Sequence, residues 1–314
     1  MDLSIIIVNW NTRDMLRDCL ASLPAATEGL ATEILVVDND SHDGSVAMLT
    51  EEFPAVQVLE SGGNLGFSRG NNLALARATG DRILLLNPDT VCPPASLARL
   101  YGFMRGRQNV GAVGPRLVDG EGHPTISGGY FPRTRFHWFG MLDPRRMWLK
   151  GPFSRRIVFV PRRQEPSRPV EYIMGACFLM RRPALEKIGG LDERFFMYFE
   201  ETDWCYRAHE AGLEIWYCAE TEITHLEGKA SEQASRFSID QFQKSYRLFV
   251  AKHYGKTAVW GFRLAQFFEY GSKSLLRRLA PGNRPGNRVL AESYWYRAKL
   301  QLKTRIDPTP PTSL

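Results

Sequence analysis

The chain has few cysteines, no long apolar run and no start typical of an exported protein. Its five cysteines are spread over 314 residues and never form a CxxC pair, so neither a disulfide framework nor a thiolate zinc site is expected. No stretch approaches the roughly 20 consecutive apolar residues that span a bilayer. No basic segment precedes the first apolar run, as a signal peptide would require. These absences predict a protein of the reducing cytoplasm.

The first predicted strand also lacks a glycine-rich turn. Residues 4–8 form a buried apolar run, and Asn9-Trp10-Asn11-Thr12 follows where a dinucleotide-binding protein would carry GxGxxG. This argues against a dehydrogenase. It also argues against a nucleotidyltransferase, the alternative enzyme class for a similar sheet with a metal, because its glycine-rich loop would stand at the same place.

Net positive charge is confined to two zones of the chain. Residues 131–168 hold ten basic side chains against two acidic ones, and residues 236–314 hold fifteen against four. Since the whole chain has a net charge of only +6, the remainder is acidic. An anionic surface or substrate is therefore expected to meet only part of the molecule.

Short β-branched runs alternate with helical patterns over the first 120 residues, which predicts an α/β fold with a mostly parallel sheet flanked by helices. The expected strands are residues 4–8, 33–37, 56–59, 82–86, 110–113 and 172–180. The expected helices are residues 15–23 (ended by Pro24), 43–53, 67–78, one from about 94, and 201–211. Ligands are expected at the carboxyl ends of the strands.

The periodicity divides the chain into two regions. Residues 1–235 form the predicted catalytic domain, within which the basic, aromatic segment 127–169 is expected to be a long loop serving as an acceptor lid. Residues 236–314 are predicted to be a helical, basic C-terminal extension, broken near 281–286. The proline-rich tail from about 307 is expected to be disordered.

Asp38 closes the second predicted strand. A carboxylate there can accept a hydrogen bond from a ribose hydroxyl or from the N3–H of a pyrimidine, which makes Asp38 a candidate nucleoside reader. The nearby Asp43 is interpreted as a turn-forming or capping residue.

A glycine-rich segment, residues 62–72, opens the helix predicted over 67–78. Free N–H groups at a helix start favour an anion, so a diphosphate is expected near it. The alternative is that the glycines only shape the turn. The candidate ligand-binding residues of this segment are Asn64, Gly66, Phe67, Gly70 and Asn71.

Two further acidic sites carry chemistry. Asp89, with Asn87 as a weaker partner, follows the strand 82–86; it can hold Mg²⁺ or Mn²⁺ against a nucleotide diphosphate, or simply form an Asn-Pro-Asp turn. Glu200 and Glu201 adjoin an aromatic run, and a carboxyl whose pKa is raised by burial and by its neighbour suits a general base. Asp203 and Arg207 are spaced as a helix ion pair.

The order of these motifs resembles that of the inverting, GT-A type, family 2 glycosyltransferases, especially the rhamnosyltransferase-like branch. The motifs that carry the resemblance are Ile5-Ile6, Val8-Asn9-Trp10-Asn11, Val37-Asp38-Asn39, Asp43-Gly44-Ser45, Asn64-Leu65-Gly66-Phe67, Gly70-Asn71-Asn72, Asn87-Pro88-Asp89, Gly175-Ala176-Cys177, Phe199-Glu200-Glu201-Thr202-Asp203 and His225. The match spans roughly residues 2–235.

The resemblance implies a role for each matching residue. Glu201 would be the catalytic base. Asp89 and His225 would hold a divalent metal, Mg²⁺ or Mn²⁺, with an Asn at position 87 where the family usually has an Asp. The nucleotide-sugar would be bound by Asn9, Asn11, Asp38, Asn64, Gly66, Phe67, Gly70, Asn71 and Asn87.

The resemblance also implies the reaction. A sugar, with L-rhamnose from dTDP-L-rhamnose as the favoured donor and UDP-sugars as the alternative, would pass to a hydroxyl of a glycan or polyprenyl-diphosphate-linked acceptor during cell-surface polysaccharide assembly. A non-catalytic sugar-binding protein is the other alternative, and the intact Asp89, Glu201 and His225 argue against it.

The C-terminal region interleaves large apolar residues with basic ones between Trp260 and Leu279. This pattern is typical of a helix lying on anionic lipid, which would attach the protein to the inner face of the cell membrane. An equal alternative is that the aromatic residues pack these helices while the charges stay in water. No nucleic-acid-binding module is recognisable, so no nucleic acid partner is expected.

Overall fold

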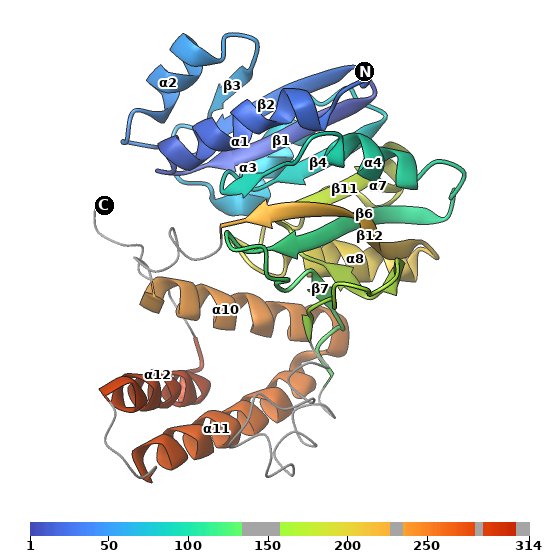
Figure 1. The fold of residues 1–314 in the computed structure, drawn as a ribbon. Coiled ribbons are helices and arrows are strands. Elements are labelled where there is room, and N and C mark those ends of the chain that lie inside the picture. The colour runs from blue at the N-terminus through green and yellow to red at the C-terminus, as the bar shows by residue number, and fades with distance from the viewer. Residues whose placement is uncertain (134–157, 227–234, 280–284, 306–314) are drawn as a thin grey trace. The chain divides into compact units, whose positions relative to one another are not determined.

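A computed structural model of the protein describes residues 1–133, 158–226, 235–279 and 285–305 (Figure 1). Residues 134–157 of the expected lid, residues 280–284 of the expected helix break and the expected tail from 307 lie outside the described residues. The chain divides into two compact units. The first is formed by Met1–Tyr130 and Val158–Gln233, and the second falls within Phe131–Ile157 and Ala234–Leu314.

Strands and helices alternate along the first unit. Its strands are β1 (Leu3–Asn9), β2 (Thr32–Asp38), β3 (Gln57–Glu60), β4 (Arg82–Leu86), β5 (Thr90–Val91), β6 (Val110–Val118), β7 (Gly128–Gly129), β8 (Val158–Phe159), β9 (Arg168–Val170), β10 (Tyr172–Ile173), β11 (Cys177–Arg181) and β12 (Glu214–His225). Its helices are α1 (Arg13–Ala26), α2 (Ser45–Glu52), α3 (Gly66–Leu75), α4 (Ser96–Phe103), α7 (Arg182–Ile188) and α8 (Glu200–Glu210).

Among the described residues, nine strands form one sheet in the order β3-β2-β1-β4-β11-β6-β12-β5, with β9 paired to β12. Strands β3, β2, β1 and β4 are mutually parallel, β6 and β12 are parallel to each other, and β11 runs antiparallel between β4 and β6. Six strands therefore share one direction, and the α/β class with a mostly parallel sheet is confirmed. Strands β7, β8 and β10 form a small second sheet.

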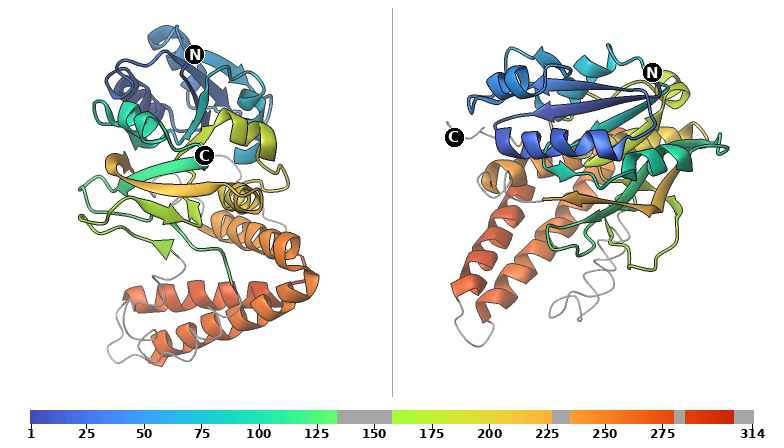
Figure 2. Two further views of the ribbon diagram at one scale, coloured as in Figure 1. Left: turned by 90° about the vertical axis from the view of Figure 1, so that its right-hand side faces the viewer. Right: turned by 45° about the horizontal axis from the view of Figure 1, so that its top comes forward.

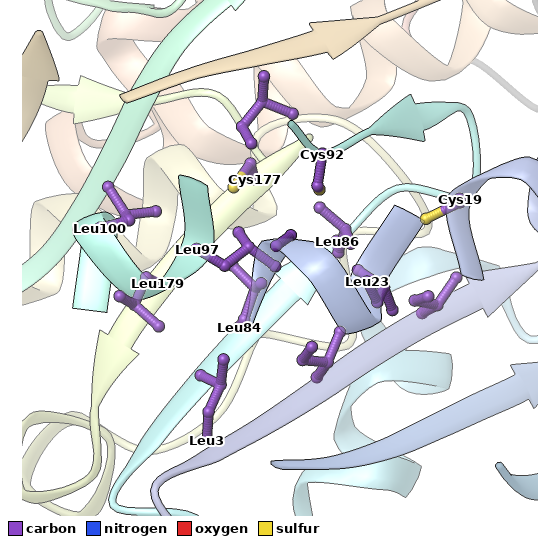
Figure 3. Packing of buried hydrophobic residues seen from close by; sticks show 14 of the residues in the cluster. Leu3, Cys19, Leu23, Leu84, Leu86, Cys92, Leu97, Leu100, Cys177 and Leu179 are labelled. Atoms are coloured by element: carbon purple, nitrogen blue, oxygen red, sulfur yellow. The ribbon is translucent and has the colours of Figure 1, made fainter. Parts of the chain in front are cut away.

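Both faces of the large sheet are buried. Successive side chains of a strand point to opposite faces, and every residue of the central strand β1 is buried. The odd-numbered Leu3, Ile5 and Ile7 of β1 belong to one core cluster with the apolar residues of α1 and α4, such as Leu23 and Leu97 (Figure 3). Leu84, Leu86, Cys177 and Leu179 extend this cluster across β4 and β11. Helices α1 and α4 thus cover one face.

Helices α3 and α8 cover the other face. An added Cβ at Gly70 of α3 would lie 2.9 Å from a methyl carbon of Val8, an even-numbered residue of β1. On β11, the even-numbered Phe178 meets Trp204 of α8 edge to face, with ring centroids 5.5 Å apart. Both helices therefore approach the sheet closely at its centre. The first turn of α8 thereby lies near the end of β4 and the start of β11.

Two sequence predictions on this unit are wrong in detail. Pro24 does not end the first helix, which continues to Ala26. A proline in the last turn removes one hydrogen bond, and the N–H and Oγ1 of Thr27 both donate to Leu23 O, at 3.0 and 2.9 Å, to close that turn. The strand expected over 172–180 is two strands, β10 and β11, because the intervening residues 174–176 leave the ladder.

The described part of the second unit is helical, as expected for the C-terminal extension. It consists of α10 (Ser235–Tyr254), α11 (Lys256–Leu279) and α12 (Pro285–Leu302), and α11 lies beside α12 (Figures 1 and 2). The Arg263 guanidinium of α11 donates to Gln301 O and Lys303 O, at 2.8 and 2.9 Å, at the end of α12. Among the described helices, none is both long enough and apolar enough to cross a membrane.

We predict that Gly70→Ala destabilises the protein by about 1–3 kcal/mol, because the new methyl group would overlap the Val8 side chain. Gly102→Ala in α4 is the matched control: an added Cβ there meets nothing within 4 Å, so a gain of up to about 1 kcal/mol is expected. Urea denaturation of the two variants measures both effects. Equal stability of the two variants would contradict the close packing of α3 on β1.

Candidate active site

Asn9 and Asp38 end neighbouring strands, in register, at the carboxyl edge of the sheet. Asn9 Nδ2 donates to Asp38 Oδ1 at 3.2 Å, and the N–H of Ser41 donates to Asp38 Oδ2 at 2.9 Å. Ser41 Oγ accepts from the backbone N–H of Asn11 at 3.0 Å. The predicted nucleotide-binding residues Asn9, Asn11 and Asp38 are therefore brought together, and Asn9 and Asn11 hold two loops in place beside Asp38.

The N–H groups at the start of α3 are already occupied by protein acceptors. Leu65 N–H donates to Asn39 Oδ1 at 2.9 Å, Gly66 N–H to Asn64 Oδ1 at 3.0 Å, and Phe67 N–H to Phe196 O at 2.6 Å. These three groups are thus paired within the protein, and a diphosphate near this turn stays a prediction. The alternative in which the glycine-rich turn is a conformational device fits the contacts.

Gly66 and Gly70 are required by close packing. Gly66 has φ +80°, and a Cβ there would lie 2.5 Å from Phe196 O, so a side chain would be strained and would push the loop before α8 away. Gly70 packs on Val8 as described above. Asn71 is buried, and its Nδ2 donates to Phe67 O at 2.8 Å within α3. Direct ligand contact by Asn64, Gly66, Phe67, Gly70 and Asn71 remains a prediction.

Asp89 and His225 lie together, as predicted, although they are far apart in the sequence. Strand β12 pairs antiparallel with β5 so that His225 faces Thr90, and the N–H of Leu226 donates to Asp89 O at 2.9 Å. His225 Nε2 is consequently 3.3 Å from Asp89 Oδ1, with both side chains largely buried. A short β ladder thus holds a carboxylate against an imidazole.

This pair fits a divalent cation that the substrate also binds. Asp89 Oδ1 is buried and accepts no hydrogen bond from a described residue, so it has lone pairs to offer. Among the described residues, no cluster of three or more His, Cys, Asp or Glu side chains is arranged to hold a metal. A cation that takes one or two protein ligands and completes its shell with phosphate and water matches this donor set.

The neighbouring Cys19 does not add a thiolate to this site. Its Sγ lies 3.7 Å from Asn87 O and 3.5 Å from Thr90 Oγ1. Burial raises the pKa of the Cys19 thiol to about 12, and the negative charge of Asp89 also raises it. Cys19 therefore stays neutral, and the candidate ligands are oxygen and nitrogen atoms.

Glu201 and the turn that carries Asp89 both contact one short backbone segment, residues 174–176. An added Cβ at Gly175 would be 3.7 Å from Glu201 Cγ. The next residue, Ala176, accepts a hydrogen bond at 2.9 Å from the N–H of Asn87. Residues 174–176, which leave the ladder between β10 and β11, thus connect the carboxylate on α8 to the turn that carries Asp89.

Glu200 and Glu201 are both buried at the start of α8. Burial is the largest cause that raises both pKa values, and the negative charge of Glu201 further raises the pKa of Glu200. Hydrogen bonds from the backbone and from the Thr202 hydroxyl act in the opposite direction on the pKa of Glu201. The pKa of Glu200 is therefore raised further than that of Glu201, so Glu201 loses its proton first and is the better placed of the two to act as a general base.

The turn before α8 has an unusual backbone. Tyr198 and Phe199 have φ values of +67° and +69°, a left-handed conformation that costs energy for residues other than glycine. Phe199 O accepts the first hydrogen bond of the helix from Asp203 N at 2.8 Å. Strain of this kind persists only where the surrounding contacts fix the chain.

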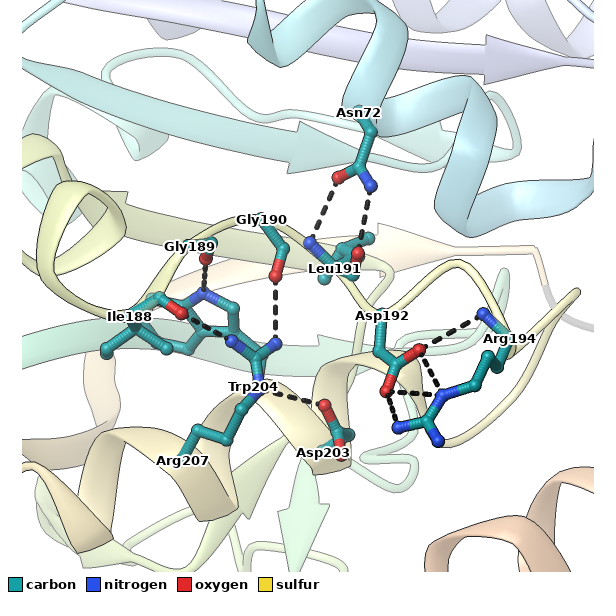
Figure 4. Close-up of polar contacts among 10 residues, drawn as sticks. All are labelled: Asn72, Ile188, Gly189, Gly190, Leu191, Asp192, Arg194, Asp203, Trp204 and Arg207. Atoms are coloured by element: carbon teal, nitrogen blue, oxygen red, sulfur yellow. Dashed lines mark hydrogen bonds and ion pairs between the residues drawn. The ribbon is translucent and has the colours of Figure 1, made fainter. Parts of the chain in front are cut away.

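Arg207 and Trp204 of α8 hold residues 188–190, in the segment that leads to this turn (Figure 4). The Arg207 guanidinium donates to Asp203 Oδ2 at 2.9 Å and to the carbonyl oxygens of Ile188 and Gly190, both at 2.8 Å. Trp204 Nε1 donates to Gly189 O at 3.0 Å. The predicted ion pair between Asp203 and Arg207 is therefore confirmed, and the Asp203 side chain is fully buried. The same guanidinium also ties α8 to the chain that precedes it.

Asn72 holds the same loop from the side of α3 (Figure 4). Its Nδ2 donates to Leu191 O at 2.8 Å, and its Oδ1 accepts from Leu191 N at 3.0 Å. An added Cβ at Gly190 would lie 2.6 Å from Asn72 Oδ1. The amide therefore pairs with a peptide unit as a neighbouring strand would, which requires a glycine at position 190.

Sequence reasoning missed Asn39, Asn72 and Arg207 as positioning residues. Asn39 and Asn72 lie within motifs that were singled out, but each also pairs with backbone groups far away in the sequence, Asn39 with Leu65 and Asn72 with Leu191. Backbone partners leave no side-chain pattern to find. For Arg207 the i, i+4 spacing from Asp203 gave the ion pair and not the two carbonyl contacts.

Comparison with known proteins supports a family assignment. Residues 4–189 match glycosyl transferase family 2. The N-acetylglucosaminyl-diphospho-decaprenol L-rhamnosyltransferase of Mycobacterium tuberculosis is 30% identical over 267 residues, covering 81% of this chain and 85% of the relative. The low-salt glycan biosynthesis hexosyltransferase Agl10 of Haloferax volcanii is 28% identical, covering 79% of this chain and 72% of the relative.

A solved structure shares the fold. The mannosyltransferase PcManGT from Pyrobaculum calidifontis, in complex with GDP-Man and Mn²⁺, superposes with a TM-score of 0.57 at 16% identity, covering 96% of this chain and 84% of that one. The expected GT-A architecture is thereby confirmed.

We predict that Arg207→Met destabilises the protein by about 3–5 kcal/mol, because Asp203 would be left as a buried carboxylate without its cation. Arg194→Met is the matched control. Arg194 also pairs with an aspartate, Asp192, but its side chain is 60% exposed, so a loss below about 1 kcal/mol is expected. Urea denaturation gives both values, and similar losses would mean that the Arg207 contacts do not hold the loop.

Proposed function

The chain belongs to glycosyl transferase family 2 and is a glycosyltransferase, and we propose that it transfers L-rhamnose from dTDP-L-rhamnose, with inversion at the anomeric carbon, to a hydroxyl of a polyprenyl-diphosphate-linked glycan. The name of the mycobacterial relative supports the sugar and the class of acceptor. The observation that carries the proposal is that Gly175-Ala176 contacts both Glu201 and the turn that carries Asp89, whose side chain lies 3.3 Å from His225.

In this proposal Glu201 removes the proton of the acceptor hydroxyl as that oxygen attacks the anomeric carbon. The new glycosidic bond forms as the bond to the nucleoside diphosphate breaks, and the diphosphate leaves with the electron pair. Burial and the charge of Glu201 raise the pKa of Glu200 well above its usual range, which favours Glu201 as the carboxylate that accepts the proton. General-base assistance of this kind contributes about 10²- to 10⁴-fold in rate.

Asp38 is the proposed reader of the nucleoside. Both of its oxygens accept one hydrogen bond from protein groups, and each carboxylate oxygen has a second lone pair for a ribose hydroxyl or a base N–H. Its bonds to Asn9 and Ser41 fix its orientation before the ligand arrives. Asn87 presents its side chain from the turn that also carries Asp89.

Asp89 Oδ1 and the His225 imidazole are the proposed ligands of Mg²⁺ or Mn²⁺. When bound, the ion neutralises the charge that develops on the leaving diphosphate. The Mn²⁺ in the structure of PcManGT supports a divalent metal. The short β5–β12 pairing fixes both donors in advance.

The acceptor lipid sets the proposed location. A polyprenyl-diphosphate chain remains in the bilayer, so the enzyme would act at the inner face of the cell membrane during assembly of a cell-surface polysaccharide. The basic C-terminal helices would attach it there as a peripheral protein.

We predict that Glu201→Gln lowers kcat by about 10²- to 10⁴-fold with the donor Kd unchanged, because the amide cannot take the acceptor proton. Glu210→Gln, at the exposed end of the same helix, is the control and should keep wild-type turnover. Release of the nucleoside diphosphate in the presence of acceptor measures kcat, and calorimetry measures donor binding. Turnover by Glu201→Gln within a few-fold of wild type would remove Glu201 from the role of base.

A thermal-shift panel of dTDP-L-rhamnose and UDP-sugars, with and without Mn²⁺, tests the donor. We predict that dTDP-L-rhamnose with Mn²⁺ gives the largest rise in Tm, since binding to the folded state alone stabilises it, and that Asp89→Ala abolishes the part that depends on metal. Asp18→Ala, an exposed aspartate of α1, should respond as wild type does. A larger rise with a UDP-sugar would instead favour that donor.

A further inference from the structure

Helix α11 carries an exposed apolar stripe, which we define as Trp260, Leu264, Phe268, Leu275 and Leu279. These side chains are 64, 50, 48, 57 and 69% exposed. At about 100° of rotation per residue, all five fall within an arc of about 100° on the helix. The stripe runs 19 residues along α11, or roughly 28 Å. Five large apolar side chains therefore form one continuous surface.

The stripe is not needed to hold the second unit together. A different face of α11 carries Phe262, Ala265 and Ser274, which are buried, and Ser274 Oγ donates to Ala291 O of α12 at 2.8 Å. Phe262 meets Tyr246 of α10 edge to face, with ring centroids 5.5 Å apart. The alternative that the aromatic residues of this region pack its helices is thus correct for Phe262 and does not account for the stripe.

The charges around the stripe have one sign. The exposed positions of α11 include Lys256, Arg277 and Arg278 and no acidic residue. The acidic residue Glu269 lies about 180° around the helix from Trp260, is largely buried and pairs with Lys273 at 2.7 Å. Arg278 has the same angular position on the helix as Trp260, and Lys256 lies about 40° outside it, so one edge of the stripe carries positive charge. Arg277 lies about 150° from the centre of the stripe and donates to Asn287 Oδ1 of α12 at 2.9 Å.

The Trp260 ring of the stripe is supported by Arg263. The Arg263 guanidinium carbon lies 4.4 Å from the ring centroid of Trp260, and Arg263 is itself fixed by hydrogen bonds to the end of α12. The indole is thus supported in an exposed position, where an amphipathic ring can enter the headgroup region of a bilayer.

We propose that this face of α11 docks on the surface of an anionic lipid bilayer, with the helix lying in the plane of the headgroups. The apolar stripe would enter the boundary of the acyl chains, and Lys256 and Arg278 would meet lipid phosphates. A second copy of the chain fits less well, since it would bring the same two positive charges against each other. Docking there would bring the enzyme to the bilayer that holds the lipid-linked acceptor. The biological role of this docking surface therefore rests on the proposed function.

Vesicle flotation tests the proposal with the full-length protein. Wild type should bind vesicles of phosphatidylcholine and phosphatidylglycerol (3:1) and bind pure phosphatidylcholine more weakly. The variant L264E/F268E should bind the anionic vesicles at least about tenfold more weakly, because two charges would be placed in the apolar boundary. Arg278→Gln should weaken anionic binding about fivefold at low salt, with little effect on neutral vesicles. Arg277→Gln removes the same charge from the side of α11 that faces away from the stripe and should have a smaller effect.

Two controls keep the test specific. Val160→Glu changes an exposed apolar residue of the first unit, 42% exposed, and should bind as wild type does; an equal loss in this control would show that net charge alone is responsible and would overturn the proposal. Since the stripe is exposed, the variants should keep the wild-type Tm. Self-association of the wild type that L264E/F268E abolishes, without vesicle binding, would assign the stripe to a second copy instead.

The same variants separate this proposal from the proposed function. L264E/F268E should transfer sugar to a short-chain, water-soluble acceptor at the wild-type rate and lose activity only on acceptor embedded in vesicles. Vesicle binding equal to wild type would overturn the docking surface and leave the transferase proposal intact. Absence of dTDP-L-rhamnose turnover by the wild type on either acceptor would overturn the donor while leaving the flotation result unaffected.

Discussion

The antiparallel insertion of β11 between β4 and β6 is the constraint on which the candidate site depends. Because β11 runs against β4, its first residue meets the last residue of β4, and the segment before it reaches the Asn87–Asp89 turn. The hydrogen bond from Asn87 N to Ala176 O fixes that meeting. Gly175 can then lie against Glu201, so one reversed strand connects the turn that carries Asp89 to the first turn of α8.

The first turn of α8 concentrates three acidic side chains, Glu200, Glu201 and Asp203, all buried. Three buried negative charges so close together would repel one another strongly, and the structure removes the problem in two ways. Asp203 is paired with Arg207, and burial and the charge of Glu201 raise the pKa of Glu200, which favours its neutral form. The charge left on Glu201 lies at the helix N-terminus, where the dipole favours a negative charge. The left-handed Tyr198 and Phe199 place the turn, and the Arg207, Trp204 and Asn72 contacts hold it.

How much the sequence predicts follows from the range of each interaction. The strand at 82–86 and the pairing of Asp203 with Arg207 depend on neighbours within a few residues, and both are confirmed. The proximity of Asp89 and His225 came from resemblance, since no local pattern links residues so far apart. The contacts of the glycine-rich turn with Asn39, Asn64 and Phe196 could not be predicted, because an exposed helix start and one that is capped in this way have the same local sequence. The division of residues 172–180 into two strands depends on a partner, Asn87, that periodicity does not show.

The N–H groups at the start of α3 donate to protein acceptors, which bears on how the charge of a diphosphate could be neutralised at the site. Leu65, Gly66 and Phe67 already donate to protein acceptors, so they give little to a diphosphate. Glu201 and Asp89 are both acidic, and the chain outside its two basic zones is acidic as a whole. A diphosphate beside them would be repelled unless a cation lay between. In the proposed reaction the Asp89–His225 pair would provide two donors for such a cation.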